Sequence, residues 1–229
     1  MKYQYVRNNY LRLQDEIAEL AKKAGRESVT LVAVTKSGSD DELLALAECG
    51  VTDIGENRPQ ELKRRGELLL AAGFAPRLHE IGNLQKNKVR LIADVVHMIH
   101  SVDSLALGEV ISRKATELCR TIPLLVEVNS GEEACKGGVR PCEVEELLLR
   151  LRELPSVEVM GLMTMGPVVS DPEELRPYFR RTKELFDILN EKYGFGNKPV
   201  LSMGMSDSYR VAIEEGSTLV RVGRRLFEK

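Results

Sequence analysis

The sequence of 229 residues contains no tryptophan, and only 5% of it is aromatic, so its core must be built from aliphatic side chains. It also lacks an excess of either charge, with 33 basic and 35 acidic residues, which gives no bulk electrostatic reason to expect nucleic acid as a partner. No apolar run approaches the roughly 20 residues that a membrane span requires, and no apolar signal segment follows Met1. We therefore expect a cytoplasmic protein that binds neither nucleic acid nor membranes.

Cysteine and histidine are scarce, and their spacing does not indicate a metal site. The four cysteines form no CxxC pair, and the histidines at positions 79, 97 and 100 show no metal-ligand spacing relative to them. We therefore expect reduced thiols, without a disulfide framework and without a bound metal. The cysteines are Cys49, Cys119, Cys135 and Cys142.

Short apolar segments typical of strands alternate along the chain with amphipathic segments typical of helices. Several strand segments are aliphatic almost throughout, such as LVAVT at 31–35, which is typical of a parallel sheet covered on both faces. The expected strands are Leu31–Lys36, Asp53–Asn57, Arg77–Gly82, Val95–Val102, Pro123–Asn129, Val157–Met165, Val200–Ser206 and Thr218–Gly223. The expected helices are Tyr3–Ala24, Asp40–Gly50, Arg58–Ala72, Gln85–Ala93, Ser104–Leu118, Glu143–Leu154, Pro172–Tyr193 and Ser208–Glu215.

Eight strand–helix units in about 200 residues predict a compact (β/α)8 barrel of the TIM type. The segment Tyr3–Ala24 would be an extra helix before the first strand. A doubly wound open sheet is the alternative, but such sheets usually have fewer strands, and no GxGxxG follows the first strand here. No Pro-, Gly- or Ser-rich linker interrupts the chain, so we expect residues 1–229 to form a single domain.

The carboxyl ends of the expected strands carry small and polar residues, and barrels place their chemistry at these ends. Lys36 ends the first strand. Burying a lysine at such a position costs free energy unless its ammonium group has a partner or a chemical function. Desolvation lowers the pKa of an ammonium group, and Schiff-base chemistry with an aldehyde requires a neutral amine. The alternative is a lysine that reaches solvent and pairs with a loop carboxylate such as Asp40 or Asp41.

The last two strands end in GMS at 204–206 and VGRR at 222–225, which place glycine beside a hydroxyl group or a cation. Glycine lets the backbone approach a ligand closely, and amides at a helix start bind anions. Loops at this place in a barrel frequently bind phosphate, although tight turns alone would also explain the glycines. Together with Lys36 on the adjoining strand, this pattern favours an aldehyde that carries a phosphate, and pyridoxal 5'-phosphate (PLP) is such a molecule.

Arg221 lies within the apolar eighth strand, on the face that it shares with Leu219 and Gly223. If that face lines the barrel, its guanidinium group can pair with the ring nitrogen of the cofactor. A permanently charged arginine would keep that nitrogen unprotonated and weaken the ring as an electron sink. The alternative is a structural ion pair with a carboxylate such as Glu127 or Glu158.

These features occur within motifs that resemble those of the pyridoxal phosphate homeostasis proteins (the YggS-like, PROSC group), which share the barrel of alanine racemase. The motifs are LVAVTK at 31–36, GENRPQE at 55–61, HEIGNLQKNK at 79–88, VNSGEEACKGG at 129–138, GLMTM at 161–165, LSMGMS at 201–206 and GSTLVRVG at 216–223. The resemblance implies that Lys36 holds PLP as an internal aldimine. It also implies that the cofactor contacts Asn57, Ile81, Gly82, Met203, Ser206, Arg221, Gly223 and Arg224.

The resemblance implies a carrier that buffers PLP and delivers it to PLP-dependent client enzymes, without an established catalytic reaction. The alternative is an amino-acid racemase or lyase that uses Lys36 as a base. Racemisation needs a second base on the opposite face of the substrate. In the racemases this base is a tyrosine from the other subunit, held there with the help of a second domain. The sequence is too short for that domain, and no feature of the sequence assigns the role of second base to Tyr178, Tyr193 or Tyr209. We therefore expect a monomeric carrier. A phosphate-binding barrel unrelated to vitamin B6 would make the placement of Lys36 and Arg221 a coincidence.

Two positions depart from the family's pattern. Ser208 stands where an acidic residue is usual after GMS, although Asp207 keeps one carboxylate nearby. The chain ends in LFEK, where family members commonly have a glycine after the phenylalanine and a further tail. These departures concern the phosphate loop and the C-terminal edge of the barrel, not Lys36 or Arg221.

Overall fold

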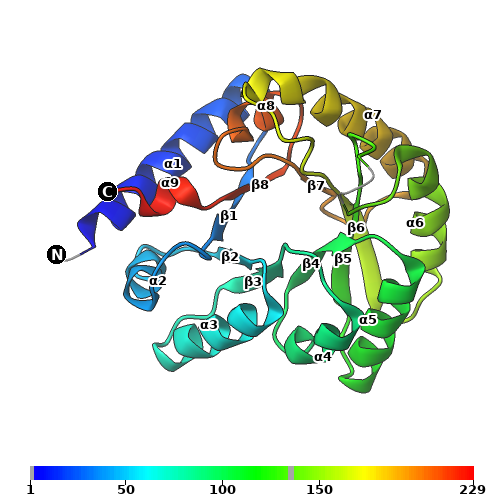
Figure 1. Ribbon diagram of the computed structural model, residues 1–229, viewed down its shortest axis with the longest axis horizontal. Helices are drawn as coiled ribbons and strands as arrows, with labels where there is room; N and C mark the ends of the chain where they lie inside the picture. Colours follow the sequence, from blue (N-terminus) through cyan, green and yellow to red (C-terminus); the bar gives the residue numbers. More distant parts are fainter. Residues whose placement is uncertain (1–2, 134–136) are drawn as a thin grey trace.

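A closed barrel of parallel strands forms the centre of the computed structural model, which describes residues 3–133 and 137–229. Each strand pairs with the next along the chain, and the eighth closes the ring on the first (Figure 1). This confirms the predicted (β/α)8 barrel. The strands are β1 (Thr30–Val34), β2 (Asp53–Glu56), β3 (Arg77–Glu80), β4 (Met98–Val102), β5 (Ile122–Glu127), β6 (Val157–Met163), β7 (Val200–Ser202) and β8 (Leu219–Val222).

Helices cover the outside of the barrel, so strand side chains are buried both toward the helices and toward the interior. All five residues of β4 are buried, including the polar residues His100 and Ser101. Leucine, isoleucine and valine make up most of the core, as the composition requires. Aromatic side chains enter it at few places, for example where Phe186 stacks on Phe195.

The outer helices begin and end where local sequence signals favour it. The hydroxyl group of Ser39 accepts a hydrogen bond from the Glu42 amide, and the Glu42 carboxylate accepts one from the Ser39 amide, which fixes the first turn of the second helix. Gly50 adopts a φ of 79° beyond its end. The outer helices are α2 (Asp40–Ala47), α3 (Pro59–Ala71), α4 (Val89–Ile92), α5 (Leu105–Glu117), α6 (Val144–Arg152), α7 (Arg176–Tyr193), α8 (Tyr209–Glu214) and α9 (Arg224–Phe227).

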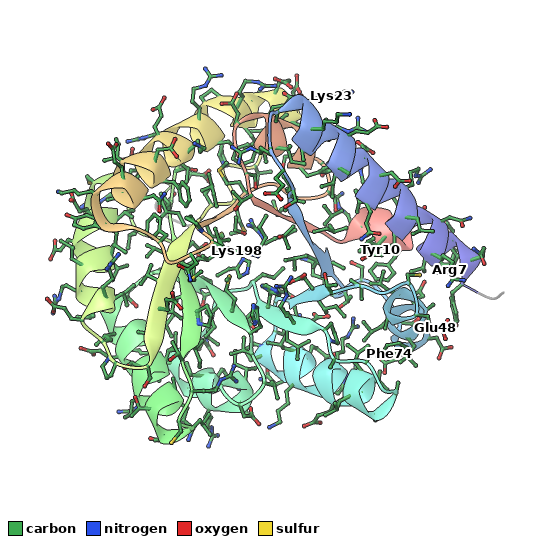
Figure 2. The ribbon with its side chains drawn as sticks, turned by 180° about the vertical axis from the view of Figure 1, so that it is seen from behind. Arg7, Tyr10, Lys23, Glu48, Phe74 and Lys198 are labelled. Carbon is green, nitrogen blue, oxygen red and sulfur yellow. The ribbon has the colours of Figure 1, made fainter. Side chains whose placement is uncertain are left out.

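The predicted extra helix is α1 (Gln4–Lys23), which lies outside the ring of strand–helix units. It packs against α2, α8 and α9, so the two ends of the chain lie side by side (Figure 1). Figure 2 shows Arg7 and Lys23 toward opposite ends of this helix. Its buried side chains recur every three or four residues, as an amphipathic helix requires. They are Val6, Tyr10, Leu13, Ile17 and Ala21.

Some strands are shorter at their carboxyl ends than the sequence predicts. The strand expected over Val200–Ser206 ends at Ser202, and the first strand ends at Val34. The polar and glycine residues that follow leave the hydrogen-bonded ladder and form the loops above the barrel. Lys36 and Ser206, two of the residues predicted to carry the chemistry, therefore lie in loops, whereas Arg221 lies within β8.

One predicted helix is also different in the structure. The segment Gln85–Ala93 forms a 3-10 turn over Lys86–Lys88 followed by the single turn of α4. The basic residues of the first part have little apolar surface to bury, because only Val89 and Ile92 are buried in the helical turns of this segment. The C-terminal turn α9 was not predicted at all.

Three of the four cysteines lie in the described part of the chain. Cys49, Cys119 and Cys142 carry free thiols, and Cys135 lies outside the described residues. None of the helices in the described part of the chain combines the length and the apolar character needed to cross a bilayer.

Candidate functional site

A cavity of about 290 Å3 opens at the carboxyl ends of the barrel strands. It brings together eight of the nine residues predicted for the site. These are Lys36, Asn57, Ile81, Gly82, Ser206, Arg221, Gly223 and Arg224. The ninth, Met203, is fully buried in the core, and Met205 lines the cavity instead.

Lys36 stands in the loop that follows β1, and buried polar contacts hold this loop in place. The Arg65 guanidinium group donates hydrogen bonds to the carbonyl oxygens of Thr35 and, at 2.8 Å, of Gly38. Arg65 also forms an ion pair with Glu56 at 3.0 Å, and both side chains are almost fully buried. Arg65 of α3, held in turn by Glu56 of β2, thus fixes the loop at Thr35 and Gly38, on either side of Lys36.

The side chain of Lys36 is exposed at the mouth of the cavity, so the desolvation expected for it from sequence is not observed. The reason is that β1 ends two residues earlier, which leaves Lys36 above the packed barrel. The two loop carboxylates considered as partners are engaged elsewhere. Asp40 pairs with Arg64 at 2.7 Å, and Asp41 accepts a hydrogen bond from the hydroxyl group of Tyr3.

Arg221 reaches the cavity from β8 with almost its whole side chain buried. Its guanidinium group donates one hydrogen bond to the hydroxyl group of Ser202 and one, of 3.0 Å, to the carbonyl oxygen of Thr164. Burial lowers the pKa of Arg221 to about 10, and the nearby carboxylate of Glu127 opposes this shift. Arg221 is therefore charged at neutral pH and is held by neutral acceptors rather than by a carboxylate ion pair.

The loops after β7 and β8 form the wall of the cavity beside the Lys36 loop, because β8 pairs with β1. The amide of Gly223 donates a 3.2 Å hydrogen bond to the hydroxyl group of Ser206, so these two groups lie together. Arg224 pairs with Asp207 on the surface. Ser208, which departs from the family's pattern, is buried, and its hydroxyl group accepts a 3.1 Å hydrogen bond from the Met205 amide, which closes the loop.

Glycines allow the backbone to come close at two other points of the site. A Cβ atom on Gly82 would lie 2.3 Å from the carbonyl oxygen of Asn57, so the two loops touch through their main chains. A Cβ atom on Gly38 would lie 2.5 Å from the ring of Phe227. The C-terminal segment LFEK therefore packs directly against the loop that carries Lys36.

Sequence reasoning missed several lining residues, of which Glu127 at the end of β5 has the strongest chemical character. Burial raises the pKa of Glu127 to about 7, with the charge of Asp103 adding to the shift. Its position in the motif PLLVEVN at 123–129 was the available signal, because a carboxylate at a strand end faces the mouth of a barrel. The other unpredicted lining residues are Val34, Ser37, Asn83, Gly137, Met165 and Met205.

A second buried carboxyl group, Glu80, lies below the cavity at the end of β3. One of its oxygens accepts a 3.1 Å hydrogen bond from the Gly82 amide, and the other has no hydrogen-bond partner. Burial raises the pKa of Glu80 to about 8, and the neighbouring carboxyl group of Glu56 adds to the shift. Glu80 is thus largely protonated at neutral pH, which avoids a second buried negative charge beside Glu56.

The Glu80→Gln variant is expected to be more stable than the native protein at high pH and equally stable at low pH. The folded protein keeps the Glu80 proton up to about pH 8, whereas the unfolded chain releases it near the ordinary value of 4.5. Native stability therefore falls as pH rises through this window, by about 1.4 kcal/mol for each unit of pKa difference. Urea unfolding at pH 5 and pH 9 measures the difference. A constant difference between the two pH values would contradict it, and Glu191→Gln, at an exposed position, is the control.

The described residues hold no group of three or more histidine, cysteine or acidic side chains that could bind a metal ion. The cavity instead offers a primary amine, two guanidinium groups, a hydroxyl group and a main-chain amide. These groups suit a small anionic molecule with an electrophilic carbon, because amines attack carbonyl groups and guanidinium groups bind phosphate.

Comparison with known proteins places residues 9–228 within the model of the alanine racemase N-terminal domain. A protein of Aquifex aeolicus named pyridoxal phosphate homeostasis protein is 40% identical over 218 residues, covering 94% of each chain. Its namesake in Helicobacter pylori is 34% identical and covers 88% of each chain.

Solved structures show the same likeness. The PipY protein of Synechococcus elongatus, solved with PLP bound, superimposes with a TM-score of 0.84 at 29% identity and covers 97% of this chain and 100% of its own. A protein of unknown function from Bifidobacterium adolescentis has a TM-score of 0.91 at 35% identity, over 98% of this chain and 95% of its own. Alanine racemase from Corynebacterium glutamicum shares the fold at 16% identity, with a TM-score of 0.71 over 99% of this chain and 61% of the racemase.

Proposed function

The chain belongs to the family of pyridoxal phosphate homeostasis proteins, and we propose that it binds PLP in the cavity at the carboxyl ends of the barrel and acts as a PLP carrier. In this proposal Lys36 attaches the cofactor covalently as a Schiff base, Arg221 faces its ring nitrogen, and Ser206, Gly223 and Arg224 hold its phosphate. Asn57, Ile81 and Gly82 complete the wall around it. Met203 supports the pocket from the core.

The observation that carries the proposal is the convergence of Lys36 and Arg221 on one cavity from adjacent strands. β1 and β8 pair in register, with Val32 beside Arg221, which brings the end of β1 next to the end of β8. An amine and a buried guanidinium group thus face the same space, with the Ser206 hydroxyl group and the Gly223 amide nearby. This set matches the aldehyde, ring nitrogen and phosphate of PLP.

When bound, PLP supplies an aldehyde that condenses with a primary amine. The residues of the chain favour holding the cofactor over using it. Arg221 stays charged at neutral pH because its pKa, although lowered by burial, is still about 10. A cation at the ring nitrogen keeps that nitrogen from taking up a proton, and an unprotonated ring withdraws electrons weakly.

The racemase alternative needs a second base facing the substrate. None of the tyrosines, all six of which lie in the described part of the chain, lines the cavity. Tyr209 is buried and donates to Glu16, and Tyr193 donates to Glu145 on the outer surface. No tyrosine of the same subunit is therefore placed as the second base, and the monomer proposed here has no partner subunit to supply one, which favours the carrier over the racemase.

We include in the proposal that the chain works as a single-domain monomer in the cytoplasm and passes PLP to client enzymes. Lys36 and Arg224 are exposed at the mouth, where a second lysine can reach the cofactor and displace Lys36. The test mixes loaded protein with an apo aminotransferase. A carrier restores aminotransferase activity. In a separate sample without the aminotransferase, the loaded carrier leaves the α-hydrogen of alanine unexchanged in D2O, whereas repeated exchange there would support a racemase.

The Asp207→Asn variant is expected to bind PLP about two- to fivefold more tightly than the native protein. Asp207 forms an exposed ion pair with Arg224. This carboxylate therefore competes with the phosphate of the ligand for the guanidinium group of Arg224. Exposed pairs contribute up to about 1 kcal/mol, which limits the gain. A fluorescence titration with PLP measures the affinity, and Asp94→Asn, which breaks the surface pair with Lys63, is the control. Weaker binding in Asp207→Asn would mean that Asp207 orients Arg224 instead of competing for it.

A further inference from the structure

A row of buried polar side chains crosses the interior of the barrel below the cavity. The guanidinium group of Arg221 donates a hydrogen bond to the hydroxyl group of Ser202. Nδ1 of His100 lies 3.1 Å from that hydroxyl group, and its Nε2 lies 3.0 Å from Nδ1 of His79. Nε2 of His79 lies 2.9 Å from a carboxylate oxygen of Asp53. The five residues come from β8, β7, β4, β3 and β2, so only the closed barrel brings them together.

The two ends of this row lie at opposite mouths of the barrel. Arg221 lines the cavity at the carboxyl ends of the strands, whereas Asp53 is the first residue of β2. Asp53 is buried, and its second oxygen accepts hydrogen bonds of 2.7 Å from the Thr52 hydroxyl group and 2.6 Å from Arg77. These donors, together with His79, keep the pKa of Asp53 well below its usual range despite its burial.

The chemistry at the two ends fixes the direction of every hydrogen bond in the row. An ionised Asp53 only accepts, so Nε2 of His79 must carry a hydrogen. Burial lowers the pKa of both histidines, so each is neutral and has one N–H group. Nδ1 of His79 therefore accepts from Nε2 of His100, whose Nδ1 accepts from the hydroxyl hydrogen of Ser202. The oxygen of Ser202 is then left to accept from Arg221, which can only donate.

We propose that Asp53 is a positioning residue for Arg221 and acts on it through His79, His100 and Ser202 from the opposite mouth of the barrel. The consequence for the bound cofactor rests on the role of Arg221 in the proposed function. Each member of the row leaves the next with one possible orientation, so the carboxylate charge of Asp53 determines whether the Ser202 hydroxyl group, which accepts from Arg221, donates to His100 or accepts from it.

The variant Asp53→Asn reverses the row. Thr52 and Arg77 both donate to one side of residue 53, which draws the amide oxygen of the asparagine to that side. Its NH2 group then faces His79 and donates to Nε2, so His79 must carry its hydrogen on Nδ1. This forces the same change on His100, whose Nδ1–H then donates to the Ser202 oxygen. That oxygen must then accept from both His100 and Arg221, and the hydroxyl hydrogen loses its acceptor, which weakens the hydrogen bond to Arg221.

Nitrogen-15 NMR of the histidine side chains, recorded without PLP, tests this directly. In the native protein His79 and His100 are both expected to carry hydrogen on Nε2, and in Asp53→Asn both are expected to carry it on Nδ1. A His97→Gln variant identifies the signals of the third histidine. A native histidine of the pair with hydrogen on Nδ1, or an unchanged His100 in Asp53→Asn, would overturn the proposal.

A second measurement follows the effect at the cofactor. With PLP bound, Asp53→Asn and Ser202→Ala are both expected to shift the absorbance maximum of the cofactor in the same direction, because both weaken the hold on Arg221. Ser112→Ala, which removes another buried hydroxyl group that donates to the Pro155 carbonyl oxygen, should leave the maximum in place. Equal spectra in Ser202→Ala and the native protein would overturn the proposal even if Asp53→Asn did not fold. Absence of a Lys36 adduct would contradict the proposed function and leave the NMR result unaffected.

Discussion

Replacement of Lys36 by alanine is expected to abolish covalent attachment of PLP while the barrel remains folded. Lys36 is the one lysine among the described lining residues, and its side chain is exposed above the core. Its removal therefore takes away the amine that can bond the aldehyde and little buried surface. After incubation with PLP and reduction with borohydride, the mass of the variant should be that of the unmodified chain. Its stability should lie within about 0.5 kcal/mol of the native value.

Two further variants serve as controls for Lys36→Ala. Lys36→Arg keeps a positive charge at the mouth but no amine that forms a Schiff base, so it should also lack the adduct. Lys198→Ala removes an exposed lysine that is not among the described residues lining the cavity, and it should keep the adduct in full. A reduced adduct of native yield in Lys36→Ala would show that another amine holds the cofactor.

Replacement of Arg65 by methionine is expected to be the most destabilising of the substitutions considered, with a loss of about 3–5 kcal/mol. The ion pair of Arg65 with Glu56 is buried, and methionine would leave that carboxyl group without its cation. The carbonyl oxygens of Thr35 and Gly38 would lose their donors as well. Because these oxygens belong to the loop that carries Lys36, weaker PLP binding should accompany the loss of stability. Urea unfolding and a PLP titration measure the two effects.

The neighbouring arginine provides a matched control. Arg64 forms ion pairs with Asp40 and Glu61, but it is about half exposed, and exposed pairs contribute about 0–1 kcal/mol. Arg64→Met should therefore change stability little and leave PLP binding unchanged. Equal losses of stability in Arg64→Met and Arg65→Met would mean that burial does not determine how much Arg65 contributes to stability.

The barrel could be predicted because most of its strands and helices are marked by local sequence patterns. The aliphatic run at 31–35 and the capping residues of α2 depend on near neighbours in the chain, and so does the apolar face of α1. The polar strand ends pointed to Lys36, Ser206 and Gly223, because the order of parallel strands places all their carboxyl ends at one mouth. The family resemblance added Asn57, Ile81 and Gly82, and all six residues line the cavity. Where a strand leaves the ladder is set by pairing with its neighbours, which is why Lys36 was expected in a strand and lies in a loop.

The contacts that could not be predicted all join residues far apart in the chain. The sequence alone shows Arg65 as one of several charged residues on a helix. Only the packing of α3 shows that its side chain contacts the loop after β1. The same holds for His79 and His100, which show no metal-ligand spacing relative to the cysteines and meet only when the barrel closes. Met203 was expected to contact the ligand, but the turn at Gly204 directs Met205 to the cavity instead.

The measurement that tests the proposed function most directly is the absorbance spectrum of the native protein with PLP before and after borohydride, followed by peptide mass mapping. We expect visible absorbance that reduction removes, and a single modified peptide in which Lys36 carries the adduct. A protein that takes up no PLP, or an adduct confined to other lysines, would contradict the assignment of this cavity as the cofactor site.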